Sequence, residues 1–378
     1  MAEILPRWSL PEVSFMTTDA YTVQSSILET YETITGRTLV VGDPVRLFLL
    51  SLADILIQLR NEINVAARQN LLSYAQGEYL DALGRIFAVT RLPASSAKTT
   101  LQFTISQALG QNYTIPRGFA VTNGEVTFTT DDELVIAAGA RSSSVTATCT
   151  TAGVAGNDYT AGQISTIVEP MPYLQGAENI TLTTGGADAE SDADLAERIR
   201  MAPNGFSVAG PKKAYTFHTY SVSSNIIDVA VDTPTPGIVN VYPLVQEGHL
   251  PSEELLAEVA EHLSDDTIRP LTDEVHVYAP SAVNYAINVD YWIEANDRAK
   301  ADAIRATVKT AVEKYRLWQQ TSVGRDITPE KLISLVMQAG ASRIKQDTLS
   351  PKNFVQLQPS QVAQCTGVTI NFLGYKDI

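Results

Sequence analysis

The first part of the chain has the spacing of apolar residues that is typical of an α-helix. Apolar side chains recur in alternating steps of four and three, and this pattern continues for about three heptads. Asp43 is a suitable N-cap residue, and Pro44 stands at the first helical position, where its missing N–H costs nothing. The pattern predicts a helix that continues to Gln76, about 34 residues and ~50 Å long. The residues of this seam are Val45, Leu49, Leu52, Leu56, Leu59, Ile63 and Ala66.

A second set of apolar residues flanks the seam on the same predicted helix. A helix that is apolar around most of its circumference needs more than one neighbour. Another helix is predicted from Asp19 to Thr35, ended by Gly36, but it is short. Two interpretations are therefore open, a bundle formed within the chain and a bundle formed with helices of other chains. The flanking residues are Leu47, Phe48, Leu50, Ile55 and Ile57.

Residues 94–184 have a different pattern. Apolar and polar residues alternate, as at Leu101, Phe103 and Ile105, and Thr, Val, Ile and Gly dominate. Turn signals such as Asn123-Gly124 separate the short apolar runs. Short strands with turns of this kind predict a small antiparallel sandwich or barrel.

From Ser191 onward, helical and strand patterns follow one another. The order strand-strand-helix-strand-strand-helix indicates α+β layering. The predicted helices span Asp192–Arg200, Pro211–Tyr220, Ser252–Leu263, Asp297–Gln319 and Thr328–Gln338. The predicted strands span Ile226–Val231, Ile238–Leu244, Glu274–Ala279, Ala282–Ile293, Arg343–Gln346 and Thr366–Phe372.

These patterns divide the chain into three predicted regions. The chain has 378 residues, which is too long for one ordinary core. We expect a multidomain α+β protein, with a helical bundle-forming region in residues 1–92 and an antiparallel β-sandwich or barrel-like domain in residues 93–185. An α+β domain is expected in residues 186–378, with sheet edges and helix faces that it offers for self-association.

Composition and charge narrow the possible functions. The chain is 44% hydrophobic and 18% charged, as ordinary globular proteins are. Its net charge of −15 argues against binding to nucleic acid or anionic lipid through bulk charge. Two cysteines, Cys149 and Cys365, make no disulfide framework. The N-terminus lacks a basic region followed by an apolar run, so no signal peptide is expected, and no apolar stretch is long enough to span a membrane.

The acid-rich segment GADAESDADLAERIR (186–200) is the first candidate for a chemical site. Its acids alternate as in a calcium-binding loop, but Ala193 and Ile199 stand where that loop needs Gly and a bidentate Glu. Ser191 and Asp194 instead form a variant of the capping box, which predicts the start of a helix. The chain contains no P-loop, Gly-x-Ser-x-Gly or His-Glu-x-x-His motif, and its histidines lack ligand spacing. We therefore expect no catalytic residue, cofactor or metal.

Several segments together resemble the baseplate J-like proteins of contractile phage tails and related contractile injection machines. No single segment is diagnostic, but their order and spacing agree along most of the chain. At Gly210-Pro-Lys-Lys213 the sequence departs from the family, which often has Ala-Ala after Gly-Thr or Gly-Ser here, and this leaves the local helix geometry open. The segments include YLDALGRIFAVTRLPAS (79–95), IPRGFAVTNGEVTFTT (115–130), the acid-rich segment, PGIVNVYPL (236–244) and GRDITPEKLISLVMQAGASRIKQ (324–346).

The resemblance implies a structural protein of the virion tail baseplate, assembled in the host bacterial cytoplasm. It implies a wedge in which a second copy of the chain and a smaller wedge protein join their N-terminal helices to the seam in a bundle. Six such wedges would close a ring around the central hub and spike, and its rearrangement would trigger contraction of the sheath. No nucleic acid and no membrane insertion are expected.

Switching in such a machine is expected as motion of rigid domains about linkers, with Pro93, Gly185 and Gly186 as hinge candidates. Two other functions remain as alternatives. A tail-associated cell-wall-degrading enzyme would need two carboxylates that face each other across a cleft. A receptor-binding module would show an exposed platform of aromatic residues.

Overall fold

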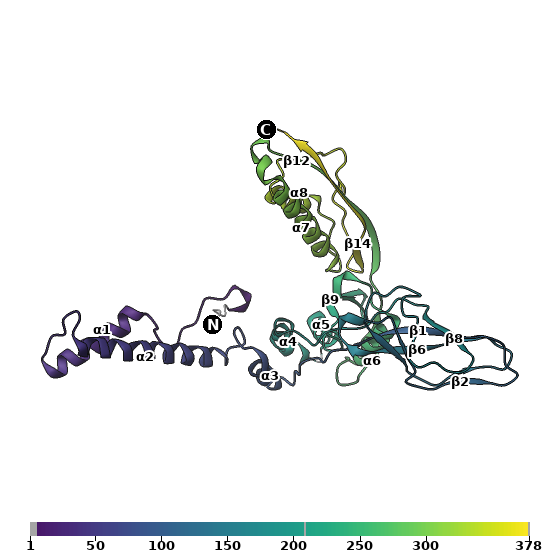
Figure 1. Ribbon diagram of the computed structural model, residues 1–378, viewed down its shortest axis with the longest axis horizontal. Helices are drawn as coiled ribbons and strands as arrows, with labels where there is room; N and C mark the ends of the chain where they lie inside the picture. Colours follow the sequence, from purple (N-terminus) through teal and green to yellow (C-terminus); the bar gives the residue numbers. More distant parts are fainter. Residues whose placement is uncertain (1–5, 208, 377–378) are drawn as a thin grey trace. The chain divides into compact units, whose positions relative to one another are not determined.

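The computed structural model describes residues 6–207 and 209–376 (Figure 1). Residues 1–5, which belong to the segment considered for a signal peptide, lie outside this description. The chain divides into two compact units, the first made of Met1–Arg91 and Ser191–Arg200, the second of Leu92–Glu190 and Met201–Ile378. Short 3₁₀ helices occur at Arg7–Ser9, Val154–Gly156, Gln246–Gly248 and Ala295–Lys300.

The first unit is helical, as predicted. It contains α1 (Ala20–Thr35), α2 (Pro44–Arg68), α3 (Gly77–Arg85) and the start of α4 (Asp192–Gly205). The carboxylates of Asp19 and Asp43 accept hydrogen bonds from the backbone N–H groups of Thr22 and Val45, which caps α1 and α2 at the predicted positions. Gly36 ends α1 in the left-handed conformation, with φ of 68°.

The predicted end of α2 at Gln76 is wrong. The helix has 25 residues and stops at Arg68, so it is about 38 Å long. Residues 69–76 form turns, in which the Gln69 side chain accepts a hydrogen bond from the Gln76 N–H at 3.0 Å. Tyr74 turns inward and is buried, and its hydroxyl accepts a hydrogen bond from the Val13 N–H at 2.8 Å. The contact of Tyr74 with the N-terminal segment thus takes the place of the last two turns of the predicted helix.

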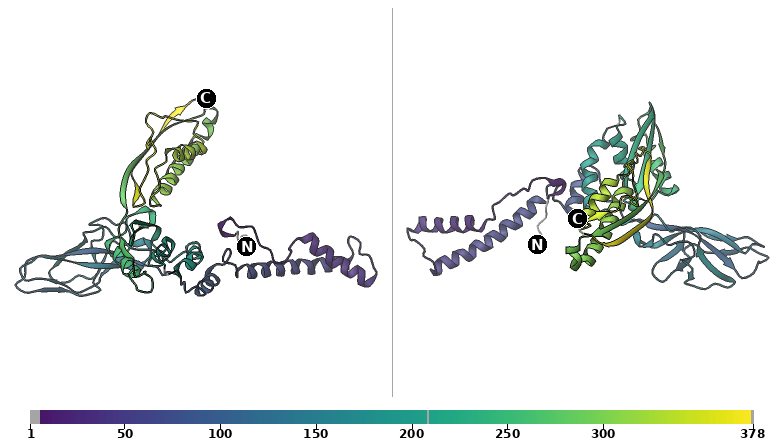
Figure 2. Two further views of the ribbon diagram at one scale, coloured as in Figure 1. Left: turned by 180° about the vertical axis from the view of Figure 1, so that it is seen from behind. Right: turned by 90° about the horizontal axis from the view of Figure 1, so that it is seen from above.

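Two segments cover one side of α2. The helix α1 lies beside its N-terminal half (Figure 2), and Val23, Leu39 and Ala53 are buried between them. Along the other half, the buried Asn64 side chain holds an extended segment. Its Oδ1 accepts hydrogen bonds from the N–H groups of Phe15 and Met16, both at 2.9 Å, and its Nδ2 donates to the Met16 carbonyl at 2.8 Å.

The second unit begins with an antiparallel β domain that is nearly closed, as the alternating pattern predicts. The central strands β1 and β6 pair along most of their length, and the edge strands β7 and β8 contact each other. Leu101, Phe103 and Ile105 alternate inward from β1 into the core. The sheet order is β7 (Thr166–Ile167), β3 (Ala120–Thr122), β4 (Thr127–Thr130), β6 (Ser142–Ala152), β1 (Ser96–Ile105) and β8 (Leu174–Asn179), and a separate pair joins β2 (Tyr113–Ile115) to β5 (Leu134–Ile136).

The rest of this unit is α+β, as predicted, and contains two separate three-stranded sheets. In the first, β10 (Ile238–Val245) lies between β9 (Ile226–Thr235) and β11 (Glu274–Val277). The helices α5 (Lys212–Tyr220) and α6 (Glu253–Leu263) contribute Tyr215, Val259 and Leu263 to its core.

In the second of these sheets, β12 (Ser281–Ile293) is the central strand. It pairs with the short β13 (Arg343–Ile344) on one side and runs parallel to β14 (Gln361–Tyr375) on the other. The helices α7 (Ala301–Gln320) and α8 (Pro329–Gln338) cover one face of this sheet (Figure 2).

Candidate interaction surface

The most unusual surface of the first unit is an apolar strip along α2, which we call the α2 strip. Its six side chains recur at spacings of three, four and seven residues, which places them on one side of the helix. Between 39% and 61% of each residue is exposed. Large apolar groups grouped in this way on a surface indicate an interaction site. The members of the α2 strip are Phe48, Leu52, Ile55, Leu56, Leu59 and Ile63.

The α2 strip is exposed because α1 and the N-terminal segment cover a different side of α2. Ala53 and Asn64 are the residues of α2 that are buried. Val45 and Leu49 of the predicted seam are half-buried. The other predicted partner-bundle residues, Leu52, Leu56, Leu59 and Ile63, all belong to the strip.

Sequence reasoning placed two members of the α2 strip, Phe48 and Ile55, only among the flanking apolar residues. They are seven residues apart, and Phe48 is followed by Leu52 at four residues, so the heptad spacing could have assigned them to the same side. Further apolar residues of this unit are exposed nearby in the sequence. Ile34 at the end of α1 is 79% exposed and Val41 in the following loop is 90% exposed.

The acid-rich segment is a helix start, as predicted. The Asp194 N–H donates to the Ser191 hydroxyl at 3.2 Å, and that hydroxyl donates to the Asp194 carboxylate at 2.6 Å. Asp192 accepts hydrogen bonds from the Gly77 N–H at 3.0 Å and from Arg91 at 2.7 Å. Arg91 also forms an ion pair with Asp81 at 2.8 Å, so these charges join α3 to the start of α4.

This ion-pair network makes the first unit sensitive to acid. Burial of the Asp192 carboxyl would raise its pKa, but the hydrogen bonds from Gly77 and Arg91 and the positive charge of Arg91 outweigh burial and lower the pKa. A carboxylate with a lowered pKa stabilises the fold above its unfolded pKa, and that contribution is lost as the pH falls through the folded value. Because the side chain is 36% exposed, solvent screening limits the contribution at pH 7 to about 0.5–1 kcal/mol.

We therefore expect Asp192→Asn to destabilise the packing of α3 against α4 at pH 7, and the difference from the natural chain to shrink as the pH falls below about 4 and to vanish below the lowered pKa of the folded chain. Rates of amide hydrogen exchange in α3 and α4, measured at pH 7 and again at a pH well below 4, test this expectation. Glu78→Gln, which removes an exposed acid of α3, is the matched control and is expected to leave the exchange rates unchanged at both pH values. A difference for Asp192→Asn that persists at the lower pH would contradict this account.

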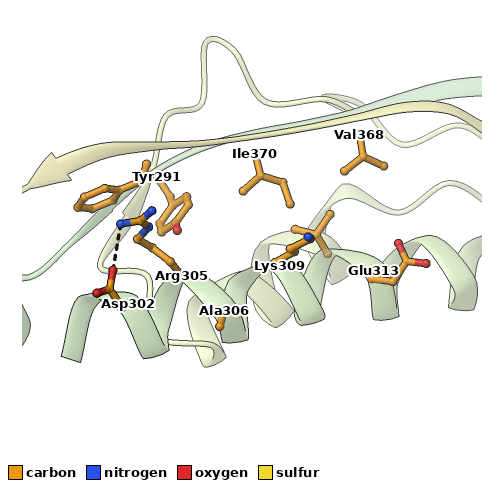
Figure 3. Close-up of a pocket in the computed structure, with 10 residues that line it drawn as sticks. Tyr291, Asp302, Arg305, Ala306, Lys309, Glu313, Val368 and Ile370 are labelled. Atoms are coloured by element: carbon orange, nitrogen blue, oxygen red, sulfur yellow. Dashed lines mark hydrogen bonds and ion pairs between the residues drawn. The ribbon is translucent and has the colours of Figure 1, made fainter.

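A groove lies between α7 and β14 in the second unit (Figure 3). Its volume is about 790 Å³, and Tyr291, Val368 and Ile370 reach into it from the strands. Opposite them α7 carries Asp302, which forms an ion pair with Arg305 at 3.1 Å, together with Lys309 and Glu313.

The groove lacks the arrangement that a hydrolase needs. Its two carboxylates, Asp302 and Glu313, are on one helix about 16 Å apart along the axis, rather than facing each other across a cleft. Glu313 is also occupied by an ion pair with Arg316. The described residues that line the groove include no Ser, Cys or His.

The pair His218 and His262 shows packing rather than ligation, whereas His249 and His276 lie beside Glu247 and Glu274. His218 stacks edge-on against Phe217, with ring centroids 5.3 Å apart, and its centroid is 6.0 Å from that of His262. Burial lowers the pKa of His218, although a hydrogen bond with the Gly205 backbone opposes the shift. Within residues 6–207 and 209–376, no group of three His, Cys, Asp or Glu side chains is placed to hold a metal ion. No helix in the same ranges is long and apolar enough to cross a membrane.

The hinge candidates have different surroundings. Pro93 is exposed. A Cβ at Gly185, whose φ is 88°, would meet nothing within 4 Å, but a Cβ at Gly186 would lie 2.4 Å from the Gly153 carbonyl oxygen. Bridges join Ser95 to Ala187 and Lys98 to Thr184, so the two glycines lie in a hydrogen-bonded part of the second unit.

Three family models match consecutive parts of the chain. The baseplate J-like N-terminal domain matches residues 42–98, the barrel domain residues 100–186, and the central domain residues 207–279, together more than half of the chain. The chain belongs to the baseplate J-like family. The first match contains all of α2, and the second contains the nearly closed β domain from Thr100 onward.

The chain is similar to two known baseplate proteins. Baseplate protein J of Escherichia phage P2 is 31% identical over 191 residues, which are 50% of this chain and 62% of the phage P2 protein. The chain thus matches less than two thirds of that relative. A chain of the solved anti-feeding prophage baseplate is 14% identical to this chain, with a TM-score of 0.42. The alignment covers 96% of this chain and 95% of the anti-feeding prophage chain.

Proposed function

We propose that this chain is a structural subunit of the baseplate of a contractile tail or a related contractile injection machine. The observation that carries this proposal is the α2 strip, an apolar helix side that the described part of the first unit leaves uncovered. Membership of the baseplate J-like family and the likeness to a phage P2 protein named as a baseplate protein support it. The subunit acts by holding other proteins and catalyses no reaction.

The α2 strip is the surface on which partner helices bind. Covering the exposed half of six large apolar side chains contributes about 1 kcal/mol each, or roughly 6 kcal/mol from this chain. That sum already exceeds the lower estimates of what association costs, about 4 kcal/mol, and partner helices with a comparable strip double it. A bundle that also covers Ile34 and Val41 gains further apolar burial. Val45 and Leu49 complete the bundle surface at its margin.

The assembly we propose is a wedge of two copies of this chain and one smaller baseplate protein. Six wedges close around the central hub and spike, and the ring holds the sheath until the baseplate rearranges. The net charge of −15 favours neither nucleic acid nor anionic lipid as a partner. Domain motion uses the linker positions Pro93, Gly185 and Gly186, and the open surroundings of Gly185 favour it over the closely packed Gly186.

The two alternative functions gain no support from the described residues. A cell-wall-degrading enzyme needs a facing carboxylate pair, but the acid-rich segment is a helix cap with Asp192 paired to Arg91. A receptor-binding module needs a platform of exposed aromatic residues, and the exposed aromatic residues are distributed over both units, as Tyr21, Phe206 and Phe354 illustrate.

The test is a mass measurement on the complex. The chain is co-expressed with the baseplate proteins encoded beside it, and the purified complex is weighed by native mass spectrometry. We expect two copies of this chain with one copy of a smaller protein, and no release of soluble products from purified cell wall. Recovery of the chain alone, or a turnover on cell wall, would refute the proposal.

A further inference from the structure

We infer that β14 pairs edge to edge with β14 of a second copy of this chain, in antiparallel orientation about a two-fold axis. This inference deepens the proposed function and rests on one part of it, namely that the assembly contains a second copy of the chain. The surface is distinct from the α2 strip, because it belongs to the last sheet of the second unit.

The outer edge of β14 has no strand beside it in the described part of the chain. The sheet order is β13-β12-β14, so one edge of β14 bonds to β12 and the other edge is open. The strand has 15 residues. Large apolar side chains on it stay exposed, including Val368 at 43% and Leu373 at 42%. An open edge presents unpaired backbone N–H and C=O groups to any strand that can reach it.

β14 lacks three of the devices by which proteins protect an open edge, namely charges, proline and short length, and its register irregularities lie on either side of an uninterrupted middle stretch. From Gln361 to Tyr375 it contains no Asp, Glu, Lys, Arg or Pro. The other described edge strands differ. β9 carries Asp228, Asp232 and Pro234, β8 carries Glu178, and β7, β11 and β13 have two to four residues. This fold therefore protects its other edges and leaves β14 available.

The middle of β14 is regular enough to accept a partner strand. The register with β12 shifts near Cys365 and again after Phe372, and between these shifts Gly367–Phe372 pairs without interruption with Ala286–Tyr291. These six residues span about 20 Å, which matches an ordinary strand. Backbone hydrogen bonds along such a stretch would extend the sheet into the partner.

An identical strand fits this edge better than a charged one. Because Gly367–Phe372 carries no charge, two copies in antiparallel register place no like charges opposite each other. The groove beneath the edge is lined by Asp302 and Glu313 and by Arg305 and Lys309, so its lining charges cancel (Figure 3). Alternate apolar side chains of an incoming strand would pack beside Val368 and Ile370 in this groove. A two-fold axis makes each copy both donor and acceptor of the same bonds.

The test uses the full chain with Leu52, Leu56 and Leu59 replaced by Asp, so that the α2 strip cannot associate. We expect this chain to sediment as a concentration-dependent dimer. Adding Val368→Lys and Thr369→Lys, which place a charge on each face of the edge, is expected to raise the dimer dissociation constant at least tenfold. Ala286→Lys, which places a single lysine on the exposed face of the central strand, is the control for each lysine tested singly and is expected to leave the dimer unchanged.

A second measurement needs no edge variant, and it decides the matter if the lysines prevent folding. Amide hydrogen exchange across Gly367–Phe372 is expected to slow as the chain concentration rises, while exchange across β9 stays constant. Three results would each overturn the inference: a chain that remains a monomer at high concentration, a dimer that persists with both lysines present, or amide exchange in β14 that does not change with chain concentration. The proposed function would then still stand, since its own test is whether the chain is recovered in a complex with a smaller baseplate protein.

Discussion

Replacing Leu52, Leu56 and Leu59 with Asp is expected to abolish assembly of the chain with its partner proteins and to leave the chain folded. The three leucines are 39–49% exposed in the first unit, so charges there meet water in the free chain. Surface substitutions of this kind change stability by about 0.5 kcal/mol or less each. In a helical bundle the same positions are core positions, where an unpaired carboxylate costs several kcal/mol.

The expected loss in affinity for the partner is at least 100-fold, or about 3 kcal/mol. It is measured by co-purification and by titration of the partner protein, with circular dichroism to monitor folding. The matched control places the same three charges on the polar side of α2, as Ser51→Asp, Gln58→Asp and Asn61→Asp. We expect the control to assemble like the natural chain. Equal assembly of the control and the strip variant would contradict the bundle.

The second large effect is expected at Gly186, whose substitution by Ala should destabilise the β domain. The new Cβ would lie 2.4 Å from the Gly153 carbonyl oxygen and 2.9 Å from the Asn157 Oδ1, and backbone atoms cannot move aside easily. Asn157 also exchanges two hydrogen bonds with the Gly186 backbone, at 2.8 and 2.9 Å. Overpacking of this kind costs about 2–3 kcal/mol, which lowers the melting temperature by roughly 5–10 °C.

Gly176→Ala is the matched control for this substitution. It also adds one methyl group to the β domain, but its Cβ would meet nothing within 4 Å. Thermal unfolding followed by circular dichroism should show a lower melting temperature for Gly186→Ala alone. Equal melting temperatures for the two variants would mean that the segment around Gly186 gives way easily, which would favour Gly186 as a hinge.

Local features of the sequence predicted much of the fold. Asp43 and Pro44 located the start of α2, and the alternation at Leu101, Phe103 and Ile105 located the inward face of β1. The end of α2 was missed because it depends on Tyr74 and on its contact with Val13, 61 residues away. No local spacing carries that information.

The candidate surface could be predicted only in part, for a similar reason. The heptad spacing identified Leu52, Leu56 and Leu59, but it could not decide which side of α2 the chain itself covers. That choice depends on Asn64, which bonds to Met16 at a separation of 48 residues. Likewise, the sequence predicted a strand at Thr366–Phe372, but its place at the edge of the sheet follows from the pairing of β12 with both of its neighbours.

The central claim is that partner helices cover the α2 strip in the assembled baseplate. Two single cysteine variants test it most directly, Leu56→Cys in the strip and Gln58→Cys on the polar side. Each is labelled with a thiol reagent in the free chain and in assembled particles, and the labelled fraction is measured by peptide mass. We predict that both sites label rapidly in the free chain and that only the Leu56→Cys site becomes protected on assembly. Rapid labelling of Leu56→Cys in intact particles would contradict the account.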